Sequence, residues 1–440
     1  MDNKVPKHII KGYNKTRNFY WRPKICYAPF NSIRFSLSGN MYFCCYNRFY
    51  SLGKYPEVSI REAWNGAKAQ EFRSYITDKN LSLGCHACYT KLLSQNFYSV
   101  GARIYDGYKA RKQGPSLMEF EISNICNLEC VMCNGENSSL IRKNREKGEP
   151  YPIVYDEAFV EQIKEFIPYL EEARFVGGEP FLSELYFKIW NEIIHINPKT
   201  KINVLTNGTI LNDRILDLYK KHNFHISFSI DSVKKETYES IRVNANYDKV
   251  MHNFQTIYEL SRKLNKELSV NICPIQANMW EIPDMIEYYS KLNVPIIIHT
   301  VVYPVNLSIS NLTKEQLKKY LEFLNERLKH SKQESKNNSH FLIWSSFISQ
   351  VNSYYKMANE KILFEKDMVD DLVEKLKNRI NSNENLKEWL KLNEILSGIE
   401  DKALLRKIII GLFIVDKSYI LAELKNSTME QIKQRLININ

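Results

Sequence analysis

The chain has 440 residues, of which 44% are hydrophobic and 25% charged, the balance of a globular protein with a substantial core and room for two or three domains. The net charge is +11, but the lysines are spread and often paired with glutamates, so a solvated basic surface is favoured over a nucleic-acid site. No apolar run approaches the roughly 20 residues that cross a bilayer, and residues 1–15 lack the apolar core of a signal peptide, which predicts a cytoplasmic protein without membrane contact.

Residues 1–114 form an aromatic, turn-rich region that holds five of the nine cysteines. Cytosolic thiols stay reduced, so grouped cysteines indicate metal or redox chemistry rather than disulfides. Cys26 and Cys44 have C-x12-G-x4-C spacing, and Cys85 and Cys88 form a C-x2-C pair. Four thiolates make a closed ligand set for either an iron–sulfur cluster or a zinc ion. Cys45 adjoins Cys44 and is an alternative ligand, although the spacing favours Cys44.

Residues 115–305 alternate β-rich runs with amphipathic helical segments, a pattern typical of βαβ units around a parallel sheet. The predicted strands are Leu117–Ser123, Ala173–Val176, Lys201–Thr206, His225–Ile230, Leu268–Cys273 and Pro295–Val302. The predicted helices are Asp156–Leu170, Leu182–Ile196, Asn212–His222 and Tyr247–Leu264. Six strands suit either a partial barrel or an open sheet. In both architectures the reactive site lies at the carboxyl ends of the strands.

A loop with three cysteines follows the first of these strands. Cys126, Cys130 and Cys133 have C-x3-C-x2-C spacing, and cysteine thiolates suit the iron of iron–sulfur clusters. Three nearby ligands leave one coordination position open, as in metal sites that perform chemistry. A structural zinc loop with a distant fourth ligand is the alternative.

The second and third strands also end in turns of a ligand-binding type. The second strand leads into Gly177–Pro180 (GGEP), where glycines let the backbone approach a ligand closely and Glu179 can accept from an ammonium group. The third strand ends in Thr206–Gly208 (TNG). Three such turns at the carboxyl ends of successive strands predict one common binding site.

Residues 306–440 are predicted to be almost wholly helical. Their sequence is amphipathic over long stretches, and the only glycines are Gly398 and Gly411, so helix breakers are few. The role of this region is not readable from the sequence.

Over residues 115–302 these features together resemble the radical SAM superfamily, whose pattern joins C-x3-C-x-aromatic-C to GGEP and a TNG-type turn on a partial (β/α)6 barrel. The resemblance implies that Cys126, Cys130 and Cys133 bind a catalytic 4Fe–4S cluster, whose open iron is chelated by S-adenosylmethionine. It implies these further cofactor contacts: Gly177, Gly178, Glu179, Thr206, Ser229 and Arg242. The chain departs from the pattern at Met132, where the family has an aromatic residue. Methionine is adaptable and still packs against an adenine ring.

The first cysteine region resembles the opening half of SPASM domains, and hence their shortened form, the twitch domain, which binds one auxiliary cluster. The resemblance implies that Cys26, Cys44, Cys85 and Cys88 hold an auxiliary 4Fe–4S cluster. The module precedes the core, as it does in a group of radical SAM proteins with an N-terminal twitch domain. Zinc remains the alternative occupant.

The resemblance implies an enzyme that cleaves S-adenosylmethionine reductively and abstracts hydrogen from a substrate C–H bond, with the auxiliary cluster assisting electron transfer. A peptide or protein side chain is the favoured substrate, and oxidation or epimerisation of a sugar or aminocyclitol is the alternative. Flavodoxin or ferredoxin is the expected type of electron donor.

Candidate acid–base groups near strand ends are Asp231, His299 and Tyr303. Cys273 is interpreted as a small buried residue, with a thiol near the active site as the alternative. Two rival functions stay open: a non-catalytic zinc or iron–sulfur binding module, and a protein that only transfers electrons.

Overall fold

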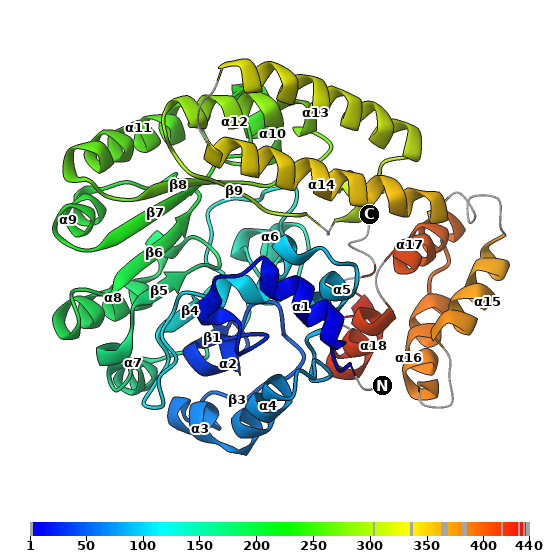
Figure 1. The fold of residues 1–440 in the computed structure, drawn as a ribbon, viewed down its shortest axis with the longest axis horizontal. Coiled ribbons are helices and arrows are strands. Elements are labelled where there is room, and N and C mark those ends of the chain that lie inside the picture. The colour runs from blue at the N-terminus through cyan, green and yellow to red at the C-terminus, as the bar shows by residue number, and fades with distance from the viewer. Residues whose placement is uncertain are drawn as a thin grey trace. The chain divides into compact units, whose positions relative to one another are not determined.

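A computed structural model describes residues 3–301, 304–334, 338–361, 368–380, 385–414, 417–429, 432–433 and 436 (Figure 1). The chain forms two compact units, of which the first is Met1–Ile230 with Arg242–Val270 and the second is Asp231–Ile241 with Asn271–Asn440. The division into regions 1–114, 115–305 and 306–440 stays a prediction. The cysteine-rich region and most of the middle region share the first unit.

The first unit is built on a sheet with the strand order β3-β2-β1-β4-β5-β6-β7-β8. Its strands are β1 (Ser32–Ser36), β2 (Asn40–Tyr42), β3 (Gly53–Lys54), β4 (Leu117–Glu121), β5 (Glu172–Phe175), β6 (Lys201–Thr206), β7 (Phe224–Ser229) and β8 (Leu268–Ile272), whose last two residues belong to the second unit. Pairing is parallel from β1 through β4, β5 and β6 to β7, and antiparallel between β1, β2 and β3. The predicted α/β class with a parallel sheet is confirmed.

The helices of the first unit follow the predicted alternation with the strands. They are α1 (Lys7–Lys15), α2 (Ala28–Asn31), α3 (Ile60–Asn65), α4 (Ala67–Thr77), α5 (His86–Leu93), α6 (Ser139–Asn144), α7 (Glu157–Lys164), α8 (Glu184–Ile196), α9 (Asp213–Lys221) and α11 (Tyr247–Leu264). The four helices α7, α8, α9 and α11 lie along one side of the strands (Figure 1), and each overlaps a helix that the sequence predicts.

The sheet face that meets these helices is apolar and includes β1. Phe120 of β4 stacks on Phe35 of β1 and on Phe175 of β5, with ring centroids 5.3 and 4.7 Å apart. Phe159 of α7 and Trp190 of α8 pack edge-on against these rings. All five side chains are buried, and such aromatic pairs stabilise a core beyond the area they bury. The cysteine-rich region therefore shares a hydrophobic core with the parallel strands.

The opposite face of the sheet is polar, because side chains alternate between the two faces along each strand. Arg34 of β1 pairs with Glu121 of β4. Arg174 of β5 bonds Glu119 of β4 at 3.2 Å and Glu172 of its own strand at 2.7 Å. The polar row continues with Asn203 of β6, His225 and Ser227 of β7, and Ser269 of β8. A charged row of this kind suits contact with a polar ligand.

The second unit holds the last strand and the C-terminal helices. Its elements are α10 (Lys235–Ile241), α12 (Ile282–Lys291), β9 (Ile296–Ile298), α13 (Lys314–Glu334), α14 (Asn338–Lys361), α15 (Val369–Ile380), α16 (Leu386–Ser397), α17 (Lys402–Ile414) and α18 (Lys417–Asn426). Next to β9, the His299 amide donates to the carbonyl of Ile272 at the end of β8 (2.8 Å). The predicted helical C-terminal region is confirmed.

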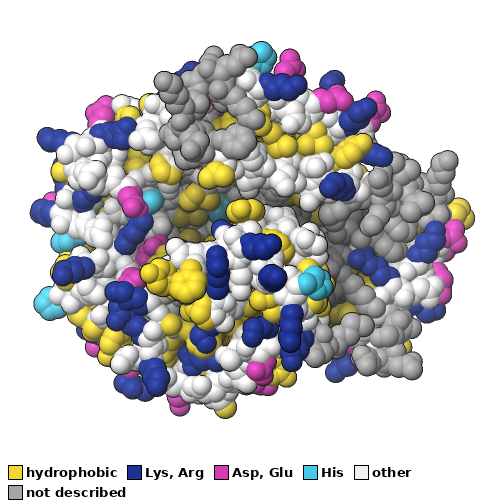
Figure 2. Space-filling model, in the orientation of Figure 1, with side chains coloured by type: hydrophobic (Ala, Val, Ile, Leu, Met, Phe, Trp, Pro, Cys, Tyr) yellow, Lys and Arg dark blue, Asp and Glu magenta, His cyan; other side chains and the backbone are white. Residues whose placement is uncertain are grey.

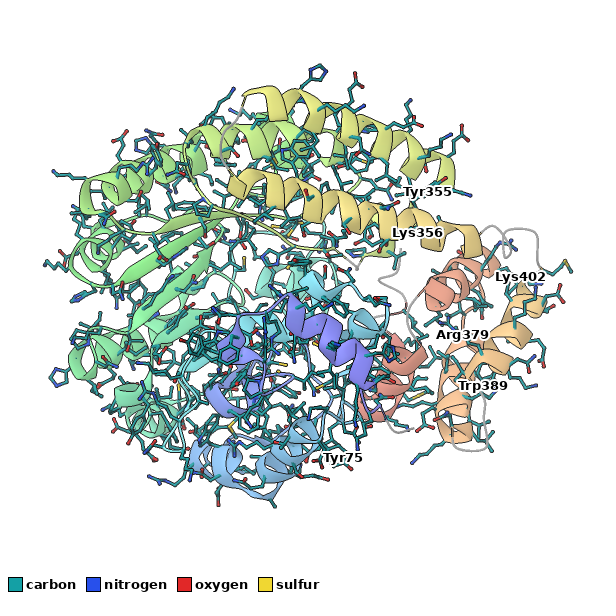
Figure 3. The ribbon with its side chains drawn as sticks, in the orientation of Figure 1. Tyr75, Tyr355, Lys356, Arg379, Trp389 and Lys402 are labelled. Atoms are coloured by element: carbon teal, nitrogen blue, oxygen red, sulfur yellow. The ribbon has the colours of Figure 1, made fainter. Side chains whose placement is uncertain are left out.

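The last four helices share a buried apolar cluster that includes Leu376 of α15, Leu392 of α16, Ile409 of α17 and Leu424 of α18. Figure 3 labels Arg379 of α15 and Trp389 of α16 in this group. The Arg379 guanidinium donates to the carbonyl of Leu412 (2.8 Å), and Trp389 is 5% exposed. Among the described helices, none has the length and apolarity to cross a bilayer.

A buried ion pair fixes the start of the cysteine-rich region. The Arg17 side chain is fully buried, and its Nε and Nη2 donate to both oxygens of Asp106 at 2.7 and 2.6 Å. Replacing Asp106 by asparagine leaves a buried guanidinium without its counter-charge, so we expect a loss of about 3 kcal/mol in the free energy of unfolding. Denaturant unfolding of wild type and variant measures this loss in the free energy of unfolding. Arg61→Gln, at the exposed pair with Glu165, should cost less than about 1 kcal/mol, and equal costs would contradict this role.

Candidate functional site

The three-cysteine loop runs from the end of β4 to α6 and is folded by local hydrogen bonds. The Cys133 amide donates to the Cys130 carbonyl (3.0 Å), and the Cys126 amide donates to Ser139 Oγ (3.3 Å). The side chain of Ser138 caps α6. Cys130 is buried and the other two thiols are half-buried. Burial raises the pKa of Cys126 to about 11 and that of Cys133 to about 12, so a metal must displace the protons when it binds.

The two glycines of the GGEP turn bring it against the cysteine loop. Gly177 and Gly178 have φ of 83° and 58°, a left-handed region that favours glycine. A Cβ on Gly178 would lie 2.3 Å from the carbonyl oxygen of Ile125, and one on Gly177 would lie 2.9 Å from that of Ser123. The Glu179 amide donates to the same Ile125 carbonyl (2.7 Å). These two glycines therefore let the GGEP turn approach the backbone of the cysteine loop, whereas the sequence predicted a close approach to a ligand.

Glu179 joins the GGEP turn to the TNG turn. Its side chain is 1% exposed and accepts hydrogen bonds from Thr206 Oγ1 (2.8 Å), the Asn207 amide (2.7 Å) and the Phe181 amide (3.2 Å). Burial raises the pKa of Glu179 to about 7, against the opposite effect of these donors. The structure therefore brings together Gly177, Gly178, Glu179 and Thr206, and holds one carboxylate ready to pair with a cation.

Asn207 connects the TNG turn to the cysteine loop, a role that the sequence analysis did not assign. Its Nδ2 donates to Asn127 Oδ1 (2.9 Å) and lies 3.9 Å from Cys126 Sγ. Its Oδ1 accepts from the amide of Thr209 (2.9 Å) and from the hydroxyl of that residue (2.7 Å). The polar turn at a strand end was the only sequence signal for this residue. All three turns are thereby joined into one site.

Arg242 lies beside the same loop. Its side chain is 6% exposed, and Nη1 is 3.9 Å from Cys130 Sγ, so a permanent positive charge stands next to one of the three thiols. Ser229 ends β7 and is half-buried. The contacts of Ser229 and Arg242 with a bound carboxylate stay predictions.

The acid–base candidates have separate surroundings. Asp231 is fully buried, and its Oδ1 accepts a hydrogen bond from the Cys273 amide (2.7 Å). This bond joins the two segments at which the chain enters the second unit. His299 Nε2 lies 2.6 Å from Asn271 Oδ1. Tyr303 lies outside the described residues. Cys273 is half-buried. The catalytic roles of Asp231, His299 and Tyr303 stay predictions.

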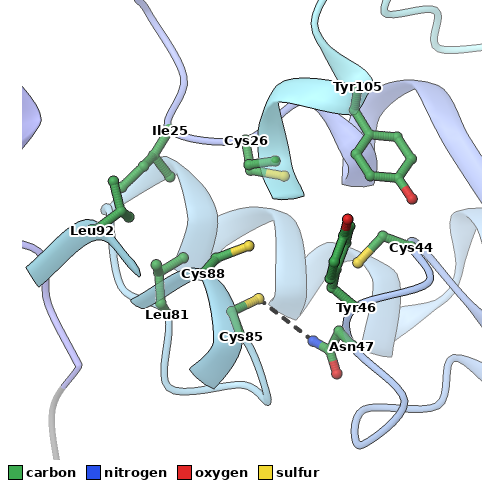
Figure 4. Close-up of a pocket in the computed structure, with 11 residues that line it drawn as sticks. Ile25, Cys26, Cys44, Tyr46, Asn47, Leu81, Cys85, Cys88, Leu92 and Tyr105 are labelled. Atoms are coloured by element: carbon green, nitrogen blue, oxygen red, sulfur yellow. Dashed lines mark hydrogen bonds between the residues drawn. The ribbon is translucent and has the colours of Figure 1, made fainter. Parts of the chain in front are cut away.

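Four cysteines of the first unit line a second site. Figure 4 shows the sulfur atoms of Cys26, Cys44, Cys85 and Cys88 turned toward one another across a single cavity. Cys44 follows β2, while Cys85 directly precedes α5 and Cys88 lies in the first turn of that helix. Burial raises the pKa of all four thiols. In the part of the chain that the structure describes, no three His, Cys, Asp or Glu side chains close on one ion position. The four thiols instead surround a cavity, and this donor set fits an iron–sulfur cluster.

Cys45 is not among the residues that line this cavity. Its Sγ lies 3.6 Å from the hydroxyl of Tyr105, and its amide donates to the same hydroxyl at 3.3 Å. Tyr105 is buried, lines the cavity, and also bonds Glu119 Oε2 of the polar sheet face (3.2 Å). The geometry therefore favours Cys44 over Cys45 as the fourth ligand.

Asn47 is a side-chain donor to the four-cysteine site. Its Nδ2 donates to Cys85 Sγ (3.5 Å) and to the Leu83 carbonyl (2.7 Å), and its Oδ1 accepts from the amides of Phe49 and Tyr50. Because hydrogen bonds to cluster sulfurs raise a cluster's reduction potential, Asn47→Asp should make the auxiliary potential more negative, as measured by a redox titration followed by electron paramagnetic resonance.

The matched control is Asn31→Asp. Asn31 is fully buried in the same module, and its amide donates to the carbonyls of Tyr105 and Tyr108. An equal shift of the potential in both variants would show that the Asn47 contact with sulfur has no special effect.

Family models match both cysteine-containing regions of the chain. Residues 120–289 match the family model of the radical SAM superfamily. The chain contains a radical SAM domain. Residues 26–89 match the SPASM model, an iron–sulfur cluster-binding domain, which confirms the predicted N-terminal position of that module. A radical SAM domain belongs to an enzyme class that uses a 4Fe–4S cluster and S-adenosylmethionine, and the SPASM domain adds auxiliary iron–sulfur chemistry.

The chain is similar to two kinds of curated relative. It is 25% identical over 161 residues to a GTP 3′,8-cyclase of Clostridium botulinum, which covers 37% of this chain and 46% of the relative. It is 27% identical over 218 residues to the antilisterial bacteriocin subtilosin biosynthesis protein AlbA of Bacillus subtilis, which covers 46% of this chain and 44% of AlbA. The chain thus spans less than half the length of these relatives.

Two solved structures are similar to parts of the chain. The structure of anSMEcpe with bound AdoMet matches 49% of this chain and 62% of its own, with a TM-score of 0.37 and 18% identity. Streptococcus suis SuiB bound to the precursor peptide SuiA matches 56% of this chain and 52% of its own, with a TM-score of 0.36 and 13% identity.

Proposed function

We propose that this protein is a two-cluster radical SAM enzyme that modifies a side chain of a peptide or protein. The observation that carries the proposal is the joining of three turns. The cysteine loop after β4 is bonded to the GGEP turn after β5 through Ile125 and to the TNG turn after β6 through Asn207. These turns follow the carboxyl ends of neighbouring parallel strands, where α/β proteins bind ligands.

Each residue of the site has a proposed task. Cys126, Cys130 and Cys133 hold the catalytic 4Fe–4S cluster and leave one iron for S-adenosylmethionine. When bound, this pair of cofactors supplies a 5′-deoxyadenosyl radical that removes hydrogen from a substrate C–H bond. Glu179 receives the amino group of the cofactor, since its carboxylate is buried and held by Thr206 and Asn207. Gly177 and Gly178 hold Glu179 in place through the contact with the cysteine loop.

The remaining polar contacts are proposed to orient the cofactor's carboxylate and the cluster. Arg242 carries a buried positive charge next to Cys130, where it offsets the negative charge that thiolates and a carboxylate bring. Ser229 is the second proposed carboxylate contact. Asn207 fixes the position of Cys126 relative to the TNG turn.

The SPASM module is proposed to hold an auxiliary 4Fe–4S cluster through Cys26, Cys44, Cys85 and Cys88, and to assist electron transfer. Four thiols that line one cavity leave no iron open for substrate. Flavodoxin or ferredoxin is the proposed type of electron donor. The match to AlbA, named as a bacteriocin biosynthesis protein, supports a peptide substrate.

The test is anaerobic reconstitution with iron and sulfide, followed by assays of iron content and of 5′-deoxyadenosine formed from S-adenosylmethionine and dithionite. We expect about eight irons per chain, as two cubane clusters require, together with deoxyadenosine formation that rises with a peptide substrate. An iron-replete protein that forms no deoxyadenosine would favour the rival that only transfers electrons. Zinc in place of iron would refute the enzyme. A response to sugars or aminocyclitols alone would replace the peptide by the alternative substrate class.

A further inference from the structure

The excess positive charge of the chain lies almost wholly in residues 3–56, a segment that begins before the SPASM match and includes the start of it. The chain holds 61 Lys and Arg and 50 Asp and Glu, but residues 3–56 hold ten of the basic residues and none of the acidic ones. The rest of the chain is therefore close to neutral. The sequence analysis treated the lysines as evenly spread, and this segment departs from that pattern.

Helix α1 presents part of this charge as a stripe. Lys7, Lys11 and Lys15 are four residues apart and all exposed, so they lie on one face of the helix. Like charges at this spacing destabilise a helix by about 0.2–0.5 kcal/mol per pair, and the side chain at the start of α1 makes no capping bond. The two like-charged pairs therefore do not stabilise α1, although Lys15 lies in the last turn, where a cation is favourable. Figure 2 shows Lys and Arg gathered over α1, without acidic side chains among them.

Exposed aromatic rings adjoin the stripe in sequence. Phe19 and Tyr20 are 72% and 75% exposed, and Arg22 is exposed after them. The buried Arg17 side chain stabilises the segment 19–22, because it donates to the Lys24 carbonyl just after that segment (2.7 Å). Aromatic residues and arginine are enriched at the centres of protein interfaces.

Helix α1 is connected to the four-cysteine cavity through α5, since no residue of α1 lines the cavity. Tyr13 of α1 is fully buried and packs against Phe97, with ring centroids 6.1 Å apart. Helix α1 also packs against α5, which carries Cys88. The lysine stripe therefore lies on the helix that packs against α5, and α5 supplies Cys88 and Leu92 to the lining of the cavity.

We propose that an acidic one-electron carrier protein docks on this face, defined by Lys7, Lys11, Lys15, Phe19, Tyr20 and Arg22, to exchange electrons with the cluster in the four-cysteine cavity. The inference rests on the proposed function, because it requires a redox cluster at that place. Complementary charge steers such encounters and speeds association, and redox complexes use small interfaces. A nucleic acid or an anionic membrane would also meet the charge, but neither explains why the stripe lies on the helix that packs against α5, a wall of the cysteine cavity.

The experiment measures the binding of oxidised flavodoxin to the reconstituted protein by anaerobic calorimetry at low salt. Lys7→Gln, Lys11→Gln and Lys15→Gln are combined in one variant. The matched control combines Lys220→Gln, Lys249→Gln and Lys263→Gln, three exposed lysines of α9 and α11 with the same total charge. We expect the stripe variant to raise Kd about ten-fold and the control less than about two-fold, with a weaker salt dependence only in the stripe variant.

Iron content and dithionite-driven cleavage separate this inference from the proposed function. Both variants should keep about eight irons and wild-type deoxyadenosine formation, since dithionite needs no docking surface. An iron-replete wild type that does not bind flavodoxin, or equal losses in both variants, would overturn the docking proposal alone. A stripe variant that loses binding of single-stranded RNA or of phosphatidylglycerol vesicles, with flavodoxin binding unchanged, would also overturn it.

Discussion

The triple variant Cys126→Ala, Cys130→Ala, Cys133→Ala should lose about four of about eight irons and all formation of 5′-deoxyadenosine. The three thiols share one loop, and the GGEP and TNG turns hold that loop at the carboxyl ends of the strands. Without them no protein ligand remains for the catalytic cluster at this site. Iron analysis and chromatography of the reaction mixture measure both losses.

The matched control is Cys273→Ala, a half-buried thiol of the second unit. It should keep the full iron content and the cleavage activity. The auxiliary cluster should survive in the triple variant, because its four ligands belong to a separate cavity. Loss of all iron from the triple variant would show that the two sites do not load independently. A fall in iron content with Cys273→Ala would make that thiol a ligand.

Binding of S-adenosylmethionine should strengthen as the pH rises from 6 to 8, and Glu179→Gln should remove most of this dependence. Burial raises the pKa of Glu179 to about 7, so the ionised fraction rises from about one tenth at pH 6 to about nine tenths at pH 8. Only the ionised carboxylate pairs with the cofactor's amino group. We expect the affinity for S-adenosylmethionine to be about ten-fold higher at pH 8 than at pH 6, as measured by anaerobic calorimetry. The ionisation of S-adenosylmethionine itself affects wild type and Glu179→Gln equally, so the difference between the two proteins reports Glu179 alone.

The same raised pKa has the opposite effect on stability. Between an unfolded pKa of about 4.5 and the folded value of about 7, the folded state binds the proton more tightly, so its stability falls as the pH rises through this window. Glu179→Gln should therefore flatten the pH dependence of the unfolding midpoint.

An unchanged pH profile of S-adenosylmethionine binding in the variant would show that Glu179 does not meet the amino group of the cofactor.

The sequence predicted the parallel strands and the main site because both follow from local patterns. Lys201–Thr206 is a strand with the bounds that its alternation predicts. The GGEP and TNG turns carry their own chemistry, so Glu179 and Thr206 could be placed at the site from sequence alone. The structure adds that Glu179 bonds both turns.

Contacts between distant segments could not be predicted. The pairing of β1 with β4 joins residues separated by about 85 positions, Ser32 with Leu117 among them, and no local pattern reports a register of that kind. The donors Asn47 and Asn207 reach sulfur atoms that are 38 and 81 positions away in the sequence. Asparagine is common in turns, so neither residue stood out before the fold placed it beside a thiol.

The parallel pairing of β1 with β4 has a consequence for how the protein can be divided. A fragment that begins at residue 115 would lack β1, and one side of β4 would lose its five paired residues. A hydrophobic strand with an unpaired edge is a template for intermolecular pairing, and the rings of Phe120 and Phe159 would lose the cover of Phe35. We expect such a fragment to aggregate on expression, which light scattering can follow. Deletion of the SPASM module therefore removes part of the scaffold along with the second cluster.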